Sequence, residues 1–172
     1  MTGKHLLFVC LGNICRSPSA EAVMKGKLKT IGWEQLVICD SAGIIGFHSG
    51  EPADARMKKY ALSRGYKLTG LSRQVKPDSD FDRFDMIIGM DDQNIKDLNA
   101  LVRNENDRKK IFRMTDFSTQ KIYNHIPDPY YTCSEGFELV LDLLEDACDG
   151  LIVHLKSENR LELKNEQLKK MT

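Results

Sequence analysis

A cysteine, an arginine and a serine lie close together near the start of the chain, in the stretch FVCLGNICRSPSAEA of residues 8–22. A thiolate is a strong nucleophile, and a guanidinium can grip two phosphate oxygens at once. A hydroxyl beside the thiolate can hydrogen-bond it and stabilise it as a leaving group. Cys10, Arg16 and Ser17 therefore indicate nucleophilic chemistry on a phosphate-like anion.

The loop between Cys10 and Arg16 is suited to hold that anion. Cys10 ends an apolar run that predicts a strand, and Pro18 is placed where the first turn of a helix tolerates proline. A strand-to-helix loop aims successive backbone N–H groups at one point, and the helix dipole adds positive charge there. Gly12 and Asn13 tolerate the positive φ that so tight a loop requires. The same positive field favours the thiolate form of Cys10.

The composition of the 172-residue chain is that of one globular domain. Apolar residues make up 41% and charged residues 29%, and Lys plus Arg equal Asp plus Glu at 25 each. No bulk charge therefore favours nucleic acid or a membrane as a partner. The apolar runs are shorter than a membrane span, and the N-terminus lacks the pattern of a secretory signal. We expect a cytoplasmic protein.

The five cysteines are scattered along the chain and odd in number, which does not fit a disulfide framework. The sequence has no CxxC pair, and its four histidines do not cluster with the cysteines, so we expect no metal site. At least one cysteine is left for reactive chemistry. The alternative is that Cys10 is an inert thiol at the end of a buried strand and that Arg16 points into solvent.

Strand and helix patterns alternate along the chain, which indicates right-handed βαβ units around a parallel sheet. Ligands of such sheets bind at the carboxyl ends of the strands. Cys10, Ser41 and Asp91 are at or just beyond such ends, and the loop that carries Asp128 can reach the same edge. The patterns predict strands over residues 5–10, 36–43, 84–92 and 109–114, and helices over 18–32, 54–65, 93–102 and from Ser134 onward.

Four motifs resemble those of the low-molecular-weight protein tyrosine phosphatases: VCLGNICRSP at residues 9–18, DSAG at 40–43, GMDDQN at 89–94 and DPYY at 128–131. The resemblance covers the chain except for about its last fifteen residues. It implies an α/β fold, with a four-stranded, doubly wound parallel sheet flanked by helices and a phosphate-binding loop after the first strand. It implies no metal and no organic cofactor. We expect one phosphatase domain over residues 1–156 and a charged tail or helix extension over 157–172.

The resemblance assigns the chemistry of phosphotyrosine hydrolysis to particular residues. Cys10 would attack phosphorus, and Asp128 would be the general acid. Arg16 and the backbone amides around it would bind the phosphoryl group. Asp128 stands between two prolines and next to two aromatic rings, where we expect partial burial to suit a proton donor, although a plain turn aspartate would look the same. The implied partners are phosphotyrosine proteins or small aryl phosphates, with phosphate-like oxyanions as inhibitors.

Aromatic side chains are expected at the mouth of the site. Tyr130 and Tyr131 follow the acid and are placed to form a wall against a substrate ring, although surface tyrosines on a turn would give the same pattern. The resemblance also makes both tyrosines candidate phosphorylation sites. On the other side it places Phe47 and His48 near the mouth and Ile14 on the rim of the loop. An exposed His48 without a role is equally compatible with the sequence.

Further residues are expected to hold the loop in its binding shape. The resemblance pairs Ser41 with Asn13 for this purpose, and it gives Cys15, if not merely packed and inert, a reversible disulfide with the nucleophile. Many relatives carry a histidine where this chain has Gly70, so we expect a rearranged or water-filled environment behind the loop, with Asp91 short of a partner. The residues expected to bind phosphate or support the loop are Leu11, Gly12, Asn13, Ile14, Cys15, Ser17 and Ser41.

Three other classes of protein fit the sequence less well. A thioredoxin-coupled arsenate reductase uses a similar Cys-x5-Arg loop but needs two further cysteines near the third strand, and residues 80–92 contain none. A non-catalytic phosphotyrosine-binding module could discard Cys10 or Asp128, and this chain keeps both. A GTP- or ATP-binding protein would carry GxxxxGK[ST], which the sequence lacks.

Overall fold

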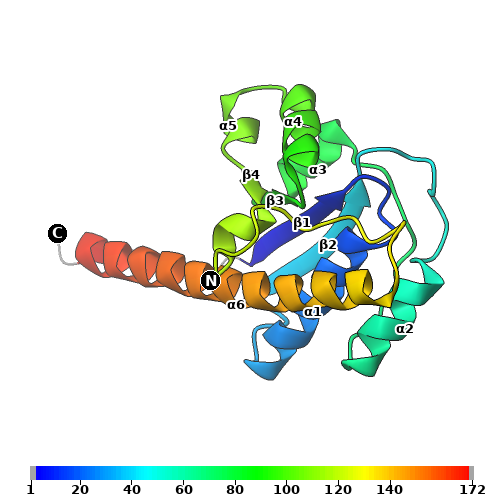
Figure 1. The fold of residues 1–172 in the computed structure, drawn as a ribbon. Coiled ribbons are helices and arrows are strands. Elements are labelled where there is room, and N and C mark those ends of the chain that lie inside the picture. Colours follow the sequence, from blue (N-terminus) through cyan, green and yellow to red (C-terminus); the bar gives the residue numbers. More distant parts are fainter. Residues whose placement is uncertain (1–2, 171–172) are drawn as a thin grey trace.

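The computed structural model describes residues 3–170, with side chains up to residue 158. A four-stranded sheet lies between two layers of helices (Figure 1). The strands are β1 (Lys4–Cys10), β2 (Val37–Gly43), β3 (Met86–Gly89) and β4 (Ile111–Arg113). The helices are α1 (Arg16–Thr30), α2 (Ala55–Ser63), α3 (Pro77–Arg83), α4 (Asp92–Leu101), α5 (Glu105–Arg108) and α6 (Ser134–Lys170), with a 3-10 helix η1 (Met114–Phe117).

The sheet is parallel throughout and has the strand order β2-β1-β3-β4. Along β1 and β2, Lys4 is paired with Val37 and Cys10 with Gly43. The chain builds outward from β1 to β2 and then crosses to β3 on the other side of β1. In such sheets ligands bind at the carboxyl ends of the strands where the strand order reverses, and the loop after β1 occupies that point. The predicted doubly wound parallel sheet is confirmed.

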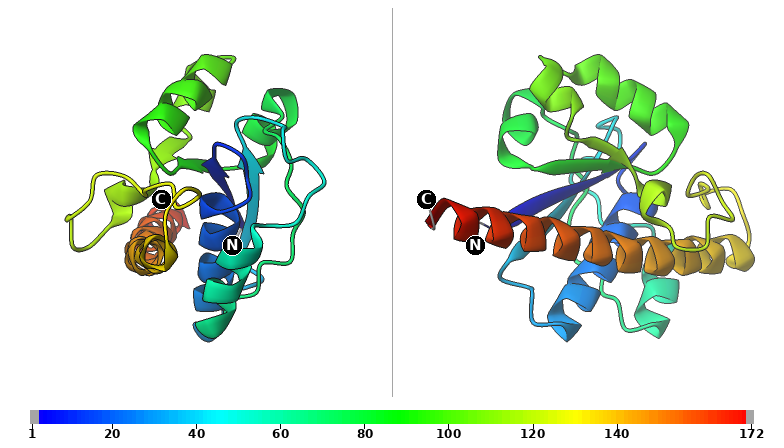
Figure 2. Two further views of the ribbon diagram at one scale, coloured as in Figure 1. Left: turned by 45° about the vertical axis from the view of Figure 1, so that its right-hand side comes forward. Right: turned by 90° about the vertical axis from the view of Figure 1, so that its left-hand side faces the viewer.

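Both faces of the sheet are covered, which explains why β1 is a continuous apolar run. Helices α1, α2 and α6 lie on one face, and α3, α4 and α5 lie on the other (Figures 1 and 2). Leu6 and Phe8 pack into the core on the α1 side, whereas Leu7 and Val9 pack into the core on the α3 side. All four side chains are fully buried. Cys10 is therefore held at the end of a strand whose last five residues are all buried.

Helix α1 begins at Arg16, two residues before the expected start at Pro18. Arg16 is thus in the first turn of α1, and the residue is only 3% exposed. Cys15 is at the N-cap position, and its side chain makes no capping hydrogen bond within the described structure. The first N–H groups of α1 are left without a side-chain cap, as expected of a helix whose N-terminus binds an anion.

The sequence patterns do not predict α3 and α5, which have seven and four residues. Both are too short to show a helical period, and their ends are set by local signals. Pro77 opens α3, and the side chain of Asn104 caps α5. The expected boundaries of α2 are confirmed, because Asp54 caps its N-terminus and Gly65 follows its C-terminus with a φ of 85°.

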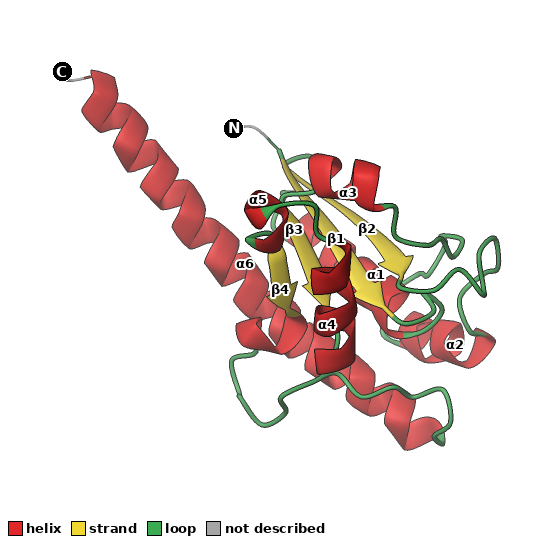
Figure 3. Ribbon diagram, turned by 90° about the horizontal axis from the view of Figure 1, so that it is seen from above, coloured by secondary structure: helices red, strands yellow, loops and turns green. Residues whose placement is uncertain are grey.

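Helix α6 has 37 residues. At 1.5 Å per residue it is about 55 Å long, and it continues well beyond the sheet (Figure 3). Its N-terminal part packs on α1 and η1, where Gly150 allows close approach, since a Cβ there would lie 1.7 Å from the carbonyl oxygen of Phe117. Within residues 3–170, no helix is both long enough and apolar enough to cross a membrane.

Candidate active site

Cys10 is the last residue of β1, and its thiol is at the base of the loop that leads into α1. The residue is 3% exposed, and its Sγ is 3.1 Å from the Oγ of Ser17 in the first turn of α1. The Ser17 hydroxyl also lies 3.3 Å from the carbonyl oxygen of Ala42. Its single proton can be donated to either partner, and a hydrogen bond to an ionised sulfur is the stronger of the two. Ser17 is thus placed to stabilise a thiolate.

The loop turns at Asn13, whose φ of 58° is in the left-handed region. That conformation costs about 1–2 kcal/mol for a residue with a Cβ, so the side chain must be well held. Nδ2 donates to Ser17 Oγ at 2.9 Å and to Ser41 Oγ at 3.0 Å. Oδ1 accepts from the N–H of Arg73 at 3.0 Å. The Ser41 hydroxyl in turn donates to Glu21 Oε2 at 2.6 Å. The expected contact between Asn13 and Ser41 is present.

The guanidinium of Arg16 is buried against polar partners. Nη1 donates to Asp91 Oδ2 at 2.5 Å and to the carbonyl oxygen of Ile126 at 3.0 Å. Nη2 donates to Asp128 Oδ2 at 3.3 Å. Burial would lower the pKa of Arg16, but Cys10, Asp91 and Asp128 together raise that pKa, so the side chain stays cationic. No described residue accepts from Nε, which leaves the Nε–Nη2 edge for a ligand.

Asp128 is fixed by hydrogen bonds rather than by burial. Its Oδ1 accepts from the N–H of Tyr130 at 3.1 Å, while Oδ2 contacts Arg16. The carboxyl side chain is 46% exposed, so the expected partial burial of this acid is present. Tyr131, 93% exposed, extends into solvent, whereas Tyr130 is 36% exposed.

A pocket of about 270 Å³ opens over Cys10 and Arg16. Phe47 stands at its mouth and is 81% exposed, so it is free to cover a bound ring. His48 is not a free surface residue, because its Nδ1 is 2.7 Å from Glu51 Oε2 and its ring lies against Gly12. The residues expected to form the walls, Ile14, Phe47, His48, Tyr130 and Tyr131, all line this one pocket, together with Ile45.

Cys15 lines the same pocket, and its surroundings disfavour the thiolate form. Burial, followed by the charges of Asp54 and Cys10, raises the pKa of the Cys15 thiol above its ordinary value. Cys15 therefore stays a neutral thiol at physiological pH. Both Cys10 and Cys15 are free thiols in this structure, and their disulfide stays a prediction.

The structure behind the loop contradicts the expectation for Asp91. Asp91 Oδ1 accepts from a backbone N–H of α4 at 2.7 Å and Oδ2 binds Arg16, so the prediction that Asp91 lacks a partner is wrong. A Cβ at Gly70 would meet no atom within 4 Å beyond its chain neighbours, and Gly70 borders a cavity of about 30 Å³ shared with Glu21 and Lys25. Lys25 pairs with Glu21 at 2.5 Å. The Glu21 carboxylate therefore has a cationic partner, Lys25, on the same helix.

Three contacts of this site were not predicted. Asp91 had a signal, because it follows the third strand, but its bond to Arg16 could not be read from the sequence. The carbonyl oxygen of Ile126 carries no side-chain signal at all. Glu21 looks like an ordinary charged residue of a helix, although it holds Ser41.

Comparison with known proteins agrees with this geometry. The family model of the low molecular weight phosphotyrosine protein phosphatases matches residues 5–161. The protein slr0328 of Synechocystis sp., which carries the same family name, is 42% identical over 153 residues, covering 89% of this chain and 97% of the relative.

Two solved structures extend the match to three dimensions. A protein tyrosine phosphatase from Entamoeba histolytica, with Hepes in its active site, is 47% identical with a TM-score of 0.88 and covers 91% of this chain and 99% of its own. YfkJ from Bacillus subtilis is 37% identical with a TM-score of 0.85 and covers 92% and 98%. With its thiol, guanidinium and carboxyl gathered in one pocket at the end of β1, the chain belongs to the low-molecular-weight protein tyrosine phosphatases, a family of hydrolases.

Proposed function

We propose that this protein hydrolyses phosphotyrosine in proteins, and small aryl phosphates, by two in-line displacements through a cysteinyl-phosphate. One observation carries the proposal: Cys10, Arg16 and Asp128 line a single pocket. A nucleophile, an oxyanion-binding fork and a proton donor are the three groups that this reaction needs.

The phosphoryl group binds first. Its oxygens accept from the Nε–Nη2 edge of Arg16, where Nη2 also contacts Asp128 before substrate binds, and from the uncapped amides of residues 11–16. The Hepes in the active site of the Entamoeba enzyme supports this mode, because a sulfonate is a tetrahedral oxyanion like phosphate. The guanidinium and the amides are in place before substrate binds. The protein therefore does not have to reorganise as negative charge develops in the transition state.

The first displacement forms the bond between Cys10 Sγ and phosphorus and breaks the bond between phosphorus and the phenolic oxygen. Asp128 gives its proton to that oxygen as it leaves, so tyrosine departs neutral. Before this step the contact between Asp128 and Arg16 Nη2, now 3.3 Å, has to be released. The incoming phosphate competes for the same guanidinium and thereby frees the carboxyl to take up its proton and face the leaving group.

The second displacement regenerates the enzyme. The Asp128 carboxylate takes a proton from water, and the water oxygen attacks phosphorus while the bond to sulfur breaks. The sulfur leaves as a thiolate, to which Ser17 can donate from 3.1 Å. Inorganic phosphate is released, and Asp128 holds the proton for the next cycle.

The walls of the pocket favour an aryl ester over an alkyl ester. Tyr131 and Phe47 are highly exposed rings on the mouth, and Tyr130 adds a third. Aromatic contacts of this kind contribute about 0.5–1.5 kcal/mol each beyond buried area. A phosphoserine is too short to fill the pocket and carries no ring, so we expect a phosphotyrosine peptide to be hydrolysed faster than the matched phosphoserine peptide.

The cysteines suit a reducing compartment. All five are free thiols in the described part of the chain, which supports a cytoplasmic site of action. Oxidation there would join Cys10 to Cys15 and protect the nucleophile from irreversible damage.

The test is hydrolysis of p-nitrophenyl phosphate in the presence of EDTA and reductant. We expect turnover by the wild type and none by Cys10→Ser, which keeps the loop but loses the nucleophile. Cys133→Ser is the matched control, because Cys133 is exposed and does not line the pocket, and it should retain full activity. Absence of turnover in folded, reduced wild type would favour a non-catalytic phosphate-binding module instead.

A further inference from the structure

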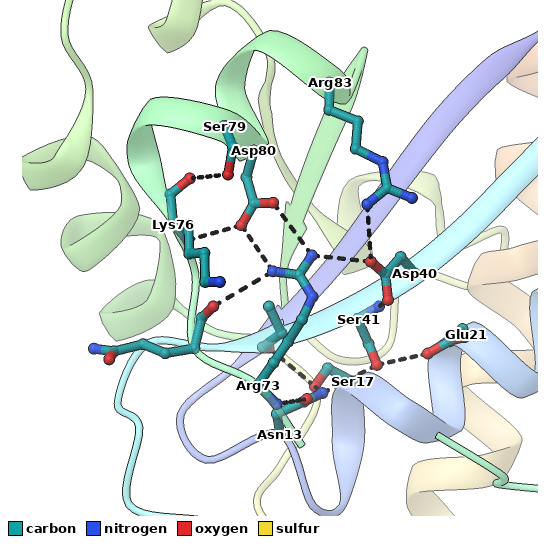
Figure 4. A network of polar contacts seen from close by, with 12 residues as sticks. Asn13, Ser17, Glu21, Asp40, Ser41, Arg73, Lys76, Ser79, Asp80 and Arg83 are labelled. Atoms are coloured by element: carbon teal, nitrogen blue, oxygen red, sulfur yellow. Dashed lines mark hydrogen bonds and ion pairs between the residues drawn. The ribbon is translucent and has the colours of Figure 1, made fainter. Parts of the chain in front are cut away.

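The side chain of Asn13 is held between Ser41 and Arg73, which are far apart in sequence. Asp40 connects these two residues. Ser41 accepts from Asn13 Nδ2 at 3.0 Å, and Arg73 donates its backbone N–H to Asn13 Oδ1 at 3.0 Å. These contacts fix both ends of the amide group, and with it the left-handed backbone of Asn13. Figure 4 shows both contacts beneath the loop.

Asp40 connects the two. Its Oδ1 accepts from the backbone N–H of Ser41 at 2.8 Å, and its Oδ2 accepts from Nη2 of Arg73 at 2.9 Å. Asn13, Ser41, Asp40 and Arg73 therefore form a closed ring of hydrogen bonds (Figure 4). The ring closes through the backbones of Ser41 and Arg73, so the two segments that hold the Asn13 amide are restrained together.

The ring is anchored to the rest of the fold through Arg73. Its Nη1 and Nη2 lie 3.0 Å and 3.3 Å from the two carboxylate oxygens of Asp80, whose side chain is 4% exposed. The backbone of this segment is also paired with the end of β2, since Gly43 N–H donates to the Arg73 carbonyl at 2.8 Å and Val75 N–H donates to the Gly43 carbonyl at 2.9 Å. Arg73 thus ties α3 and β2 to the loop.

Without the guanidinium of Arg73, Asp80 would lose its side-chain cation in the described structure, and Asp40 would keep only Nη1 of Arg83, at 3.9 Å. Like charges in a partly buried site repel strongly, which would separate the end of β2 from α3. The N–H of Arg73 would move with its segment, and Asn13 would lose its only acceptor contact in the described structure. Loop amides that have to converge on one phosphate tolerate little such movement.

We propose that the Asp40–Arg73 ion pair is a positioning pair of this enzyme: through Ser41 and Asn13 it keeps the amides of residues 11–16 in phosphate-binding geometry. The inference rests on the proposed function of that loop. Neither residue lines the pocket, so neither touches substrate.

The test compares Arg73→Met with Arg103→Met. Arg103 is a matched control, because it binds Asp107 at 2.7 Å and Asp82 of α3 at 2.6 Å but makes no contact with the loop. With p-nitrophenyl phosphate, and at a temperature where circular dichroism shows both variants folded, we expect Arg73→Met to lower kcat about 10- to 100-fold. Arg103→Met should stay within about twofold of wild type. Equal losses in the two variants would overturn the proposal.

A double substitution distinguishes positioning from general weakening. If the pair acts through Asn13, then Arg73→Met should add less than about twofold to the loss already caused by Asn13→Ala. Asp40→Asn should likewise be non-additive with Arg73→Met. Independent, multiplying losses would mean that Arg73 does not act through Asn13, and the proposal would fail.

The affinity for inorganic phosphate measures the binding geometry of the loop independently of catalysis. In the Cys10→Ser background, isothermal titration should show phosphate affinity about tenfold weaker with Arg73→Met and unchanged with Arg103→Met. This measurement separates the two proposals. If wild type shows no turnover while Arg73→Met still weakens phosphate binding, the proposed reaction fails and the positioning pair stands. Unchanged phosphate affinity would overturn the positioning pair whatever the turnover.

Discussion

Arg16 and Arg64 are both surrounded by carboxylates, yet only one of them leaves an edge open. Arg64 caps the C-terminus of α2, and its Nε, Nη1 and Nη2 all donate within the protein. Its partners are on α6, namely Glu138, Asp142 and Glu145. Arg16 uses Nη1 twice and Nη2 once, and no described residue accepts from its Nε.

The difference shows how the same side chain serves two purposes. A guanidinium whose nitrogens are all bonded inside the protein can only join elements, and Arg64 joins α2 to α6. Arg16 draws its partners from three places, the start of α4, the carbonyl of Ile126 and the loop of Asp128, and keeps one edge for a ligand. An N–H group without a partner in the protein is thus a better indicator of a binding site than the number of carboxylates around an arginine.

Substituting the two arginines by lysine should give the largest contrast. A lysine at position 16 keeps the charge but cannot bond Asp91, the Ile126 carbonyl and a phosphate together. We expect Arg16→Lys to lower kcat/KM for p-nitrophenyl phosphate by about 10³-fold or more. Arg64→Lys should remain within about twofold of wild type. Comparable losses in both would remove the functional distinction between them.

The acid beside Arg16 should matter nearly as much. For Asp128→Ala we expect a loss of ~10²–10⁴-fold with a tyrosine-like leaving group, about 3–5 kcal/mol. The loss should shrink for aryl phosphates with more acidic phenols, because these need less protonation. Asp142→Ala, which removes a carboxylate from Arg64 instead, is the control and should leave kcat unchanged. A loss below about threefold in Asp128→Ala would contradict the general-acid role.

Arg64 should show its effect in stability. Arg64→Met leaves three carboxylates of α6 without their cation and should lower the free energy of unfolding by about 1–3 kcal/mol. Urea denaturation gives this value, and kcat measured well below the unfolding midpoint should not change. A fall in kcat under those conditions would mean that the α2–α6 connection influences the pocket.

The smallest effect concerns pH. Tyr66 donates to Glu145 at 2.7 Å, and burial together with Glu145 raises the pKa of this tyrosine above its ordinary value near 10. Above pH 10 the unfolded chain therefore loses this proton before the folded protein does, so stability falls as the pH rises. Tyr66→Phe should cost about 1 kcal/mol at pH 8 and show a shallower decline above pH 10. Denaturation midpoints that decline in parallel for both proteins would contradict this.

Local signals in the sequence were sufficient for the sheet and for most of the helices. The apolar run ending at Cys10, the cap at Asp54 and the stop at Gly65 each correspond to a boundary in the structure. A parallel sheet brings the ends of its strands to one edge, which predicted that Cys10 and the Asp128 loop would meet. The places of Ile14, Phe47 and His48 at the pocket came from the family resemblance, and Ile45 was not predicted.

What the sequence could not show depends on contacts between distant residues. The bond of Arg16 to Asp91 spans 75 residues, and that of Asn13 to Arg73 spans 60. Asp91 is distinguished by its place after the third strand, but nothing in the sequence indicates its partner, and Arg73 does not differ in type or spacing from the many charged residues that stay in solvent.

The ion pairs of Arg16 can form only late in the synthesis of the chain. Its partners lie 75 to 112 residues downstream, so they leave the ribosome long after the strand and loop that need them. A guanidinium buried without them would be an unpaired charge and would cost several kcal/mol. A nascent chain that ends before the Asp128 loop carries Cys10 and Arg16 but cannot close the site around them. We therefore expect phosphatase activity only from chains long enough to include that loop.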